Sequence, residues 1–522
     1  MKHFKGLLTF AFLICVLLVP YQVFATNYQL TILHTNDHHG HFMKYNPYPV
    51  KDVGGLAAQS TLVNIVRADV EKAGGVVMLL SGGDINTGIP ESDLLDAEPD
   101  IVAMNLIGYD AMVLGNHEFD NSPDVLMKQK GWAKFPFIAA NIFRKDTGEA
   151  LVKPYVIKDY DGLKVAILGL TTETTPILTL PANVKDVVFK NPIDIAKALV
   201  PKLKQEVDLV IALTHLGFYE DMDSKGDIAL AKAVPEIDVI VGGHTHTEMT
   251  EAQLVGQTII VQAGGYSDNV GRLDLMVEKE TKKISQHSFK LIPVNKKKRV
   301  KFNKKRYYMY VDKGYVEDTE IVKAMEPYLA KADSKLSQPI GQAGVALMGG
   351  KTESRSKETN LGNLITDAMR DKTSSDIAFQ NGGGIRASIS PGAITYRDIL
   401  TVQPFGNTLV IVDMTGAQII DALNFAATKV GSGAFLHVSG LKWTIMGEKA
   451  KNVTVADQPI DLGKTYKVVT NNFMATGGDG YAMLKPLPQE DTGFVDADAF
   501  KDYVTKFDRV EPKLEGRLTI TQ

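Results

Sequence analysis

Cysteine is almost absent from this chain, which has one, Cys15, among its 522 residues. Because Cys15 lies in the segment that we expect to be a signal peptide, the rest of the chain can form no disulfide, zinc finger or thiol nucleophile. A large charge of one sign is also missing, since the formal net charge is −4. This balance argues against a general nucleic-acid-binding protein, which usually carries a strongly basic face.

Long apolar runs are missing too, except at the N-terminus. Basic residues at positions 2, 3 and 5 precede an apolar run of about 13 residues, 6–18, and Val23-Phe24-Ala25 has the pattern of a cleavage site. The run is shorter than the roughly 20 residues that a membrane span requires. We expect a signal peptide over residues 1–25, cleaved near Ala25, and a periplasmic protein without membrane attachment after cleavage. The alternatives are an uncleaved anchor and a lipoprotein signal at Cys15, although Leu13-Ile14 lacks the small residue that such a signal needs.

The chain is too long for a single hydrophobic core, so we expect at least two domains. Apolar runs in the first half each end in a polar cluster, and runs that are apolar on both faces are typical of buried strands in an α/β domain. Such a domain binds its ligands outside the ends of its strands. The expected strands are Leu30–Leu33, Val76–Leu80, Met112–Leu114, Phe135–Ala139, Val165–Leu168, Leu209–Leu213, Val239–Val241 and Ile259–Val261.

The pattern changes at residues 317–337, which are highly charged. Ile321, Met325 and Leu329 have helical spacing there, which predicts an exposed linker helix. A second mixed region follows, with strands expected at Thr408–Val412, Val438–Thr444, Tyr466–Val469 and Arg517–Ile520. The one dense basic stretch, Lys296–Arg306, is expected to be a solvated strand or loop edge.

Eight of the eleven histidines fall in four short clusters, at 34–41, 115–120, 214–217 and 242–246. Each cluster directly follows an apolar run, and Asp84 in SGGDINTG follows another. Because strand ends in one sheet can converge, we expect five loops to bring carboxylates, imidazoles and an amide to one point.

Two divalent ions held about 3.5–4 Å apart repel each other and favour a bridging carboxylate, for which Asp84 is the candidate. Imidazole and carboxylate ligands suit zinc, manganese, cobalt or iron. Such a pair polarises phosphoryl oxygens and lowers the pKa of a bound water. Each cluster alone is a weak signal, but all five together predict a dinuclear site.

The series DxH, GD, GNHEFD, H and GHTH resembles the signature of the calcineurin-like metallophosphoesterases. The longer segments HTNDHHGHF, LLSGGDINTGIPESDL, GYDAMVLGNHEFDN, NGGGIR, QPFGN and NFMATGGDGY resemble the bacterial periplasmic 5′-nucleotidase/UDP-sugar hydrolase family. The resemblance implies an α/β fold with a four-layer αββα sandwich over residues 26–316. It also implies a linker helix at 317–337 and a smaller mixed α+β substrate-binding domain at 338–522.

The resemblance also assigns metal ligands and catalytic residues. It implies that one ion is held by Asp37, His39, Asp84 and His246, and the other by Asp84, Asn116, His215 and His244. His117 would not be a ligand but would donate to the phosphoryl oxygen or leaving group, with Asp120 orienting its ring. Some family members have glutamine in place of His246, so the preference among Zn, Mn, Co and Mg stays open.

The C-terminal motifs would supply the nucleotide contacts. By resemblance, Phe405 and Phe473 stack the base and Asp479 accepts from the ribose hydroxyls. Arg355 and Arg386 would pair with phosphate, and the remaining contacts to base or sugar would come from Asn381, Asn407 and Gly433. Lys351 stands where UDP-sugar hydrolases have a second arginine, and lysine cannot bind phosphate in a bidentate way.

The resemblance therefore implies an exported 5′-nucleotidase that releases phosphate from nucleoside 5′-phosphates, with UDP-sugars as possible further substrates. The alternatives are a dinucleotide pyrophosphatase, a 2′,3′-cyclic-nucleotide phosphodiesterase with 3′-nucleotidase activity, and a nucleotide-binding protein that has lost catalysis. We expect small-molecule nucleotides rather than nucleic acid as partners, a monomer, and a cleft between the domains that closes by rotation about the linker.

Overall fold

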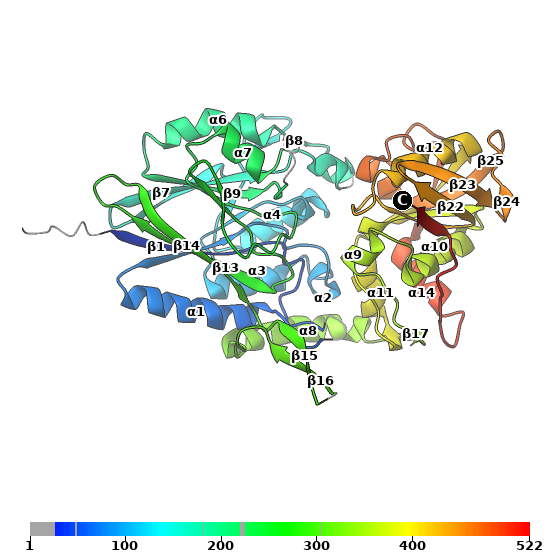
Figure 1. Ribbon diagram of the computed structural model, residues 1–522, viewed down its shortest axis with the longest axis horizontal. Coiled ribbons are helices and arrows are strands. Elements are labelled where there is room, and N and C mark those ends of the chain that lie inside the picture. The colour runs from blue at the N-terminus through cyan, green and yellow to red at the C-terminus, as the bar shows by residue number, and fades with distance from the viewer. Residues whose placement is uncertain (1–26, 47–49, 180, 220–224, 304, 522) are drawn as a thin grey trace, which may run out of the picture.

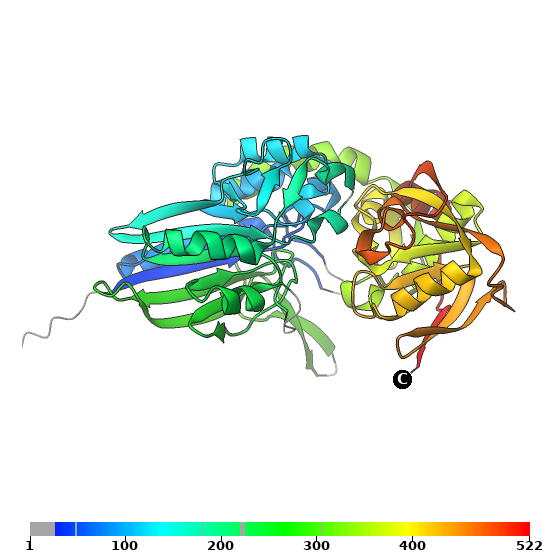
Figure 2. The ribbon, with the colours of Figure 1, turned by 90° about the horizontal axis from the view of Figure 1, so that it is seen from above.

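The computed structural model describes residues 27–46, 50–179, 181–219, 225–303 and 305–521. The expected signal peptide, its cleavage site and Cys15 lie outside the described residues. Two units lie side by side along the longest axis, the N-terminal unit in blue to green and the C-terminal unit in yellow to red (Figure 1). Figure 2 shows the same two units from above. In the described part of the chain, no helix combines the length and apolar character needed to cross a membrane.

The first sheet of the N-terminal unit has six strands, in the order β14-β13-β1-β2-β3-β4. Strands β1, β2, β3 and β4 run parallel, so their carboxyl ends share one edge. The strands are β1 (Tyr28–Thr35), β2 (Val76–Ser81), β3 (Ala111–Val113), β4 (Phe137–Ile138), β13 (Asn269–Val277) and β14 (Ile284–Pro293).

The second sheet also has six strands, in the order β11-β12-β10-β9-β7-β6. Its parallel core consists of β7, β9, β10 and β12. The strands are β6 (Tyr155–Tyr160), β7 (Leu163–Thr171), β9 (Leu209–His215), β10 (Val239–Val241), β11 (Gln253–Val255) and β12 (Thr258–Val261). All eight apolar runs singled out in this half of the sequence overlap strands, although β4 is shorter than its run.

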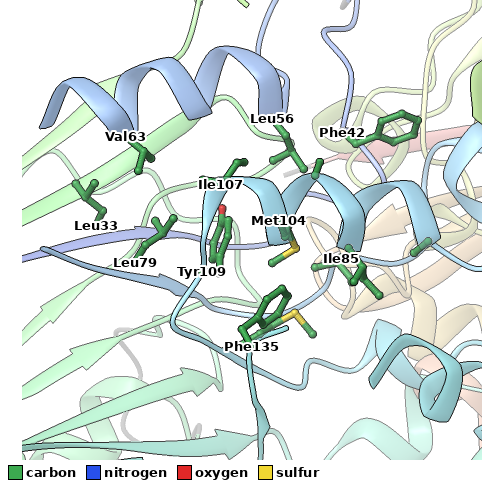
Figure 3. Packing of buried hydrophobic residues seen from close by; sticks show 14 of the residues in the cluster. Leu33, Phe42, Leu56, Val63, Leu79, Ile85, Met104, Ile107, Tyr109 and Phe135 are labelled. Atoms are coloured by element: carbon green, nitrogen blue, oxygen red, sulfur yellow. The ribbon is translucent and has the colours of Figure 1, made fainter. Parts of the chain in front are cut away.

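The two sheets pack face to face around fully buried aliphatic side chains such as Leu30, Met78 and Ile211. The outer face of the first sheet is covered by α1 (Leu56–Lys72), α3 (Glu98–Ile107) and α4 (Pro123–Trp132). Figure 3 shows Val63, Met104 and Ile107 of these helices in one cluster with Leu33 and Leu79 of the strands. The second sheet is covered by α6 (Pro192–Leu203) and α7 (Asp227–Ala233). These four layers confirm the expected αββα sandwich.

Local sequence explains where α6 begins. Asn191 is its N-cap, and the side-chain oxygen accepts hydrogen bonds from the backbone N–H groups of Ile193 and Asp194. Pro192 occupies the first helical position, where its fixed φ angle suits the helix and no N–H is needed. The helix therefore starts at a defined residue before its apolar face packs on the second sheet.

The expected linker helix is α8 (Thr319–Leu336), capped by Asp318, whose side chain accepts from the N–H of Glu320. Ile321 and Met325 are fully buried in the same core as α1 and α3. The description of an exposed helix was therefore wrong for one of its faces, because the apolar positions pack on the N-terminal unit.

The C-terminal unit has a five-stranded sheet, β21-β18-β25-β20-β26, and a four-stranded sheet, β24-β23-β22-β27. Two hydrophobic cores form around α10 (Asn360–Thr373), α12 (Gly416–Ala427) and α14 (Asp496–Val504). The larger sheet comprises β18 (Ile377–Asn381), β20 (Thr408–Thr415), β21 (Leu436–Ser439), β25 (Thr465–Asn471) and β26 (Gln489–Val495). The smaller comprises β22 (Leu441–Met446), β23 (Lys449–Val455), β24 (Gln458–Pro459) and β27 (Leu518–Thr521).

One expected strand in this unit was wrong. The run Val438–Thr444 is divided at Gly440, whose φ of 80° lies in the left-handed region that favours glycine. Its two halves belong to β21 and β22, which are in different sheets. The basic stretch, by contrast, does form exposed strands, β15 (Lys297–Phe302) and β16 (Lys305–Tyr310).

Candidate active site

The metal-ligand candidates lie at the carboxyl ends of five strands, but these strands belong to two sheets. Asp37 and His39 follow β1, Asp84 follows β2 and Asn116 follows β3, all in the first sheet. The second sheet contributes His215 at the end of β9, and His244 and His246 after β10. The expectation of convergence at one sheet was therefore wrong, because the sandwich brings two sheet edges together.

Backbone strain is concentrated in these loops. Positive φ angles are uncommon for residues other than glycine and cluster at functional sites, where the surrounding structure must hold them. Five of the seven ligand candidates have them: Asp37 (52°), His39 (48°), Asp84 (55°), His244 (77°) and His246 (56°). Gly115 is required for a different reason, since a Cβ there would collide with Asp84 and His215.

One group of candidate ligands consists of Asp37, His39 and His246, whose ligand atoms all lie within 4.8 Å of one another. The Nε2 atom of His246 is 3.1 Å from Nε2 of His39 and 3.2 Å from Oδ1 of Asp37. Three donor atoms therefore face a common point.

A second group consists of Asp84, His215 and His244. The Nε2 atom of His215 lies 3.0 Å from Oδ2 of Asp84 and 3.2 Å from Oδ1 of Asn116. That same amide oxygen is 2.9 Å from Nδ1 of His244. A third group joins Asp84 to His39 and His117, so Asp84 lies between the first two groups.

Hydrogen bonds behind the cluster set the tautomers of two histidines. The Nδ1 atom of His39 lies 3.0 Å from the carbonyl oxygen of Asn86, and Nδ1 of His215 lies 2.6 Å from that of Gly82. A carbonyl can only accept, so each Nδ1 carries the proton and each Nε2 presents a lone pair to the cluster. This arrangement fits divalent metal ions.

Burial lowers the pKa of His39 well below its usual value and that of His244 to about 3. Burial alone would raise the pKa of Asp84, but His215 and His117 outweigh it and hold that pKa well below its usual value. Neutral imidazole and ionised carboxylate are the forms that bind metals. Burial would also lower the pKa of His215, yet Asp84 and Asp37 raise it to about 10, which shows how strongly this position favours a cation.

His117 and Asp120 form the expected pair, with 2.5 Å between Nδ1 and Oδ2. Thr87 donates a hydrogen bond of 2.7 Å to the same carboxylate oxygen. Burial would lower the pKa of His117, but the carboxylates of Asp120 and Asp84 outweigh it and raise that pKa. The structure therefore favours a protonated imidazole beside the metal-ligand groups.

Glu118 was missed in the sequence, although it holds the ligand loops together. Its Oε2 accepts from the N–H groups of Asp84 (2.9 Å) and Gly115 (2.6 Å). Its Oε1 accepts from the N–H of Ile85 (2.9 Å) and from the side chain of Asn86 (3.1 Å). One feature of the sequence could have pointed to Glu118: it is a carboxylate within GNHEFD, next to candidate site residues, and no function had been assigned to it.

A cavity of about 540 Å³ lies between the two units. From the N-terminal unit it is lined by Asp84, Asn116, His117, Asp120, His244 and His246. All nine substrate-contact candidates line its other side: Lys351, Arg355, Asn381, Arg386, Phe405, Asn407, Gly433, Phe473 and Asp479. The remaining ligand candidates, Asp37, His39 and His215, are buried behind the cavity wall. The sequence did not single out the lining residues Leu178, Thr179, Tyr219, Thr245, Gly383, Gly384, Gly431 and Ser432.

The two halves of the cavity meet at an aromatic contact. The rings of His117 and Phe405 are nearly parallel, at 25°, with centroids 6.0 Å apart. The guanidinium of Arg386 lies 5.5 Å from the centre of the Phe405 ring. Deeper in the C-terminal half, Asn381 donates a hydrogen bond of 2.7 Å to Asp479. An aromatic surface, a carboxylate and cations therefore lie next to the metal-ligand groups.

Three cations in the cavity, Lys351, Arg355 and Arg386, lack an ion-pair partner among the described residues. Burial and the neighbouring arginines lower the pKa of Lys351 to about 8, and burial and Arg386 lower that of Arg355 to about 10. The buried Nε atom of Arg355 has no hydrogen-bond partner. Such a cluster is stabilised by an anion that supplies the missing charge and acceptors.

Arg397 ties the units together beside the cavity. It lies on α11 (Tyr396–Val402) of the C-terminal unit. Its Nε is 2.5 Å from Glu91 on α2 (Pro90–Asp93), and a terminal nitrogen is 2.9 Å from Asp333 on α8. These partly exposed ion pairs join the C-terminal unit to both the sandwich and the linker helix.

Comparisons with known proteins agree with this architecture. Residues 30–248 match the model of the calcineurin-like phosphoesterases, and residues 339–486 match that of the 5′-nucleotidase C-terminal domain. A 5′-nucleotidase from Vibrio vulnificus is 43% identical over 92% of this chain and 91% of its own length. Protein UshA from Escherichia coli is 41% identical over 92% of this chain and 91% of its own length. The crystal structure of a 5′-nucleotidase precursor from Thermus thermophilus superposes with a TM-score of 0.82 at 32% identity, covering 94% of this chain and 99% of that one.

These matches span both units, and the chain belongs to the 5′-nucleotidase family of calcineurin-like metallophosphoesterases. It is a hydrolase of nucleotide phosphoesters, and its family implies divalent metal ions in the ligand cluster.

Proposed function

We propose that this member of the 5′-nucleotidase family hydrolyses nucleoside 5′-monophosphates to nucleoside and inorganic phosphate. One observation carries the proposal: four metal-ligand candidates line the same cavity of about 540 Å³ as two phenylalanines and three cations that have no ion-pair partner among the described residues. A nucleotide has matching parts, since it carries a phosphate, a ribose and an aromatic base. The cavity is also within the range of small-molecule sites in general.

Two divalent ions would be held by the two groups described above. Asp37, His39, Asp84 and His246 would bind one of them, and Asp84, Asn116, His215 and His244 the other. When bound, the ions would polarise the phosphoryl oxygens and acidify the attacking water. The hydrogen bonds to the backbone at Asn86 and Gly82 place the proton of each neutral ring on Nδ1, so that Nε2 of His39 and His215 is the nitrogen that faces the ion.

His117 is the proposed proton donor. Asp120 orients the ring through Nδ1 and keeps it protonated, which leaves Nε2 for a phosphoryl oxygen or the departing 5′-oxygen. The bond from phosphorus to the 5′-oxygen breaks as the oxygen of water adds to phosphorus. One proton of that water stays on the phosphate product and the other passes to solvent, from which His117 is later reprotonated. The proton from Nε2 neutralises the alkoxide of the nucleoside.

The C-terminal half selects the substrate. Phe405 and Phe473 hold the base between them, and because every base has a flat π face, this arrangement tolerates different bases. Asp479, positioned by Asn381, accepts hydrogen bonds from the ribose hydroxyls. Arg355 and Arg386 pair with phosphate oxygens, and Asn407 and Gly433 lie within reach of base or sugar. Lys351 adds a third charge near the phosphate but lacks the fork of an arginine.

The wider biological role is also part of this proposal. We place the enzyme in the periplasm on the signal-peptide pattern of residues 1–25. We divide the mature chain at 26–316, 317–337 and 338–522, with α8 as the helix that joins the two units while packing on the core of the first. Since one chain supplies both halves of the cavity, a monomer suffices for activity.

Phosphate release by the mature protein, residues 26–522, tests the proposal. The protein is stripped with EDTA, reloaded with Zn, Mn, Co or Mg, and given AMP, UDP-glucose, a dinucleotide or 2′,3′-cAMP. We expect the highest kcat/KM for AMP and recovery only with added metal. A preference for the cyclic ester would favour the phosphodiesterase alternative, and a preference for the dinucleotide would favour a pyrophosphatase. Full activity without metal would contradict the dinuclear mechanism.

A further inference from the structure

The β15–β16 hairpin carries the densest positive charge of the chain. Eight of the eleven residues at 296–306 are Lys or Arg, and no acidic residue follows before Asp312. The two strands form a sheet with each other, and the hairpin projects from the N-terminal unit beyond α8 (Figure 1). None of its described residues lines the cavity. It is therefore separate from the catalytic machinery.

The cations of this hairpin are free to meet an external partner. At its base, Lys296 pairs with Glu248 and Asp268. Further out, five basic residues are exposed and have no acidic partner among the residues that the structure describes: Lys298, Arg299, Lys301, Lys305 and Arg306. Internal ion pairs therefore do not account for this charge.

The same hairpin exposes apolar side chains on one of its faces. Phe302 is 65% exposed and Met309 57% exposed, which is unusual for such large apolar groups. The antiparallel register pairs Val300 with Tyr307, Phe302 with Lys305, and Lys298 with Met309. Because paired residues share a face and successive residues alternate, Val300, Phe302, Tyr307 and Met309 all lie on one side, which also carries Lys298 and Lys305 at its two ends.

The opposite face is cationic and aromatic. It carries four cations, Lys297, Arg299, Lys301 and Arg306, together with Tyr308 and Tyr310. The hairpin is thus amphipathic, with one side that is mainly apolar and one side that is mainly charged. An isolated two-stranded hairpin is only marginally stable in water, so a partner that buries its apolar face would also stabilise it.

We propose that the β15–β16 hairpin docks this enzyme onto an anionic lipid surface. Clusters of four to eight Lys or Arg residues are attracted to anionic headgroups, while tyrosines and exposed apolar side chains enter the interfacial layer. Long lysine and arginine side chains can lie along that layer with their charges in the headgroup region. The hairpin has all of these features within 14 residues, 297–310.

Charge complementarity also predicts how the molecule is oriented. The whole chain has a net charge of −4 despite this strongly basic segment, so the rest of the surface is acidic on balance. An anionic bilayer would attract the hairpin and repel the remainder. Nucleic acid would satisfy the cations and tyrosines, but it would leave the aliphatic side of the hairpin, with Val300 and Met309, unburied. The proposal departs from the expectation that the mature chain has no membrane contact, and it does not depend on the proposed substrate.

Co-sedimentation with lipid vesicles tests the proposal, using the mature chain and vesicles of phosphatidylcholine with or without 30% phosphatidylglycerol. We expect binding only to the anionic vesicles, and weaker binding as salt is raised. Arg299→Gln/Lys301→Gln should weaken binding at least tenfold, since each charge contributes about a fivefold factor. The matched control is Lys449→Gln/Lys451→Gln, which removes two exposed lysines of β23 and should bind as the wild type does.

A second variant, Phe302→Ser/Met309→Ser, keeps the charge and should remove the binding that persists at high salt. AMP hydrolysis in solution should be unchanged in all three variants, which shows that each one folds. The proposal is overturned if the wild type ignores anionic vesicles at low salt, or if the control pair weakens binding as much as the hairpin pair. It is also overturned if neither hairpin variant reduces binding, or if a single-stranded oligonucleotide is bound more tightly than the vesicles.

Discussion

The two walls of the cavity differ in how completely their polar groups are already paired. On the N-terminal wall, carbonyls at Asn86 and Gly82 fix two histidines, and Glu118 accepts four short bonds from the loops around them. On the C-terminal wall, Lys351, Arg355 and Arg386 lack ion-pair partners among the described residues. The first wall is preorganised by protein contacts, and the second becomes complete only when a ligand binds.

This difference has a physical basis. A metal centre requires donor atoms placed to within fractions of an ångström, so its loops are held by hydrogen bonds and tolerate strained φ angles. A substrate must enter and leave, so its subsites keep unsatisfied charge and accessible aromatic rings. Three substitutions should separate the two walls experimentally, and a fourth, at His437, tests the core behind the C-terminal wall. They are given in order of decreasing effect.

The largest effect is expected for His117→Ala, which removes the proposed proton donor. We expect kcat for AMP to fall by about 10²–10⁴-fold, while the metal content and the affinity for adenosine remain unchanged. Steady-state kinetics, elemental analysis and calorimetry measure the three quantities. Unchanged turnover would remove His117 from the mechanism, and loss of metal would show that it belongs among the ligands.

Acid should destabilise the C-terminal unit through His437, which is buried and 2.7 Å from the carbonyl of Ser354. Burial lowers the pKa of His437 to about 4, below the 6.5 of the unfolded chain, so the unfolded state binds the proton more tightly. The contribution of neutral His437 to the free energy of unfolding is complete above pH 6.5. It is lost as the pH falls toward 4, by up to roughly 3 kcal/mol. Denaturant melts of a Trp132→Phe background, which leaves Trp443 as the reporter of this unit, measure the loss.

His437→Gln retains a donor for Ser354 but no longer titrates, so it should flatten this pH dependence. His287→Gln alters an exposed residue of β14 and serves as the matched control. A slope that is identical in the wild type and in His437→Gln would show that acid acts elsewhere.

Glu118→Gln tests the preorganisation of the N-terminal wall. The side-chain amide of glutamine has one oxygen in place of two, so it can accept fewer of the four hydrogen bonds. Its NH2 group would also face the backbone N–H donors of Asp84 or Gly115. We expect divalent-ion affinity to fall by about 10–100-fold, as is common for groups that orient metal ligands. Calorimetric titration of the stripped protein measures this, with Glu71→Gln on the exposed face of α1 as the control. Unaltered metal affinity would mean that the loops hold their shape without this carboxylate.

The smallest effect is expected for Phe473→Ala on the C-terminal wall. Loss of one stacking surface should weaken nucleotide binding by about 1–2 kcal/mol, and it should appear in KM while kcat and metal content are kept. Phe494→Ala, at an exposed position of β26, is the control. A large fall in kcat would contradict the assignment of catalysis to the N-terminal wall and of substrate binding to the C-terminal wall, because it would show that this ring takes part in catalysis.

The ligand candidates were visible in the sequence because each lies within a few residues of a buried strand. An apolar run followed by Asp, His or Gly is a local pattern, and β1, β2, β3, β9 and β10 all have it. The nucleotide-contact candidates came from resemblance, since Phe405 and Asp479 carry no local signal of their function. Glu118 could not be found in either way, because its role depends on N–H groups of other loops.

By itself, the sequence determined the α/β class, the strands that end in ligand residues, the family and the basic character of the hairpin. Those properties reside in periodicity and in short motifs, which need no distant partner. Only the tertiary structure decided that two sheets rather than one supply the ligands, that α8 buries one face, and that Gly440 sends its flanking strands to different sheets. It also paired β15 with β16 so that Val300, Phe302, Tyr307 and Met309 gather on one face, while the other face carries most of the cations. Each of these depends on contacts between segments far apart in the chain, and local composition does not encode them.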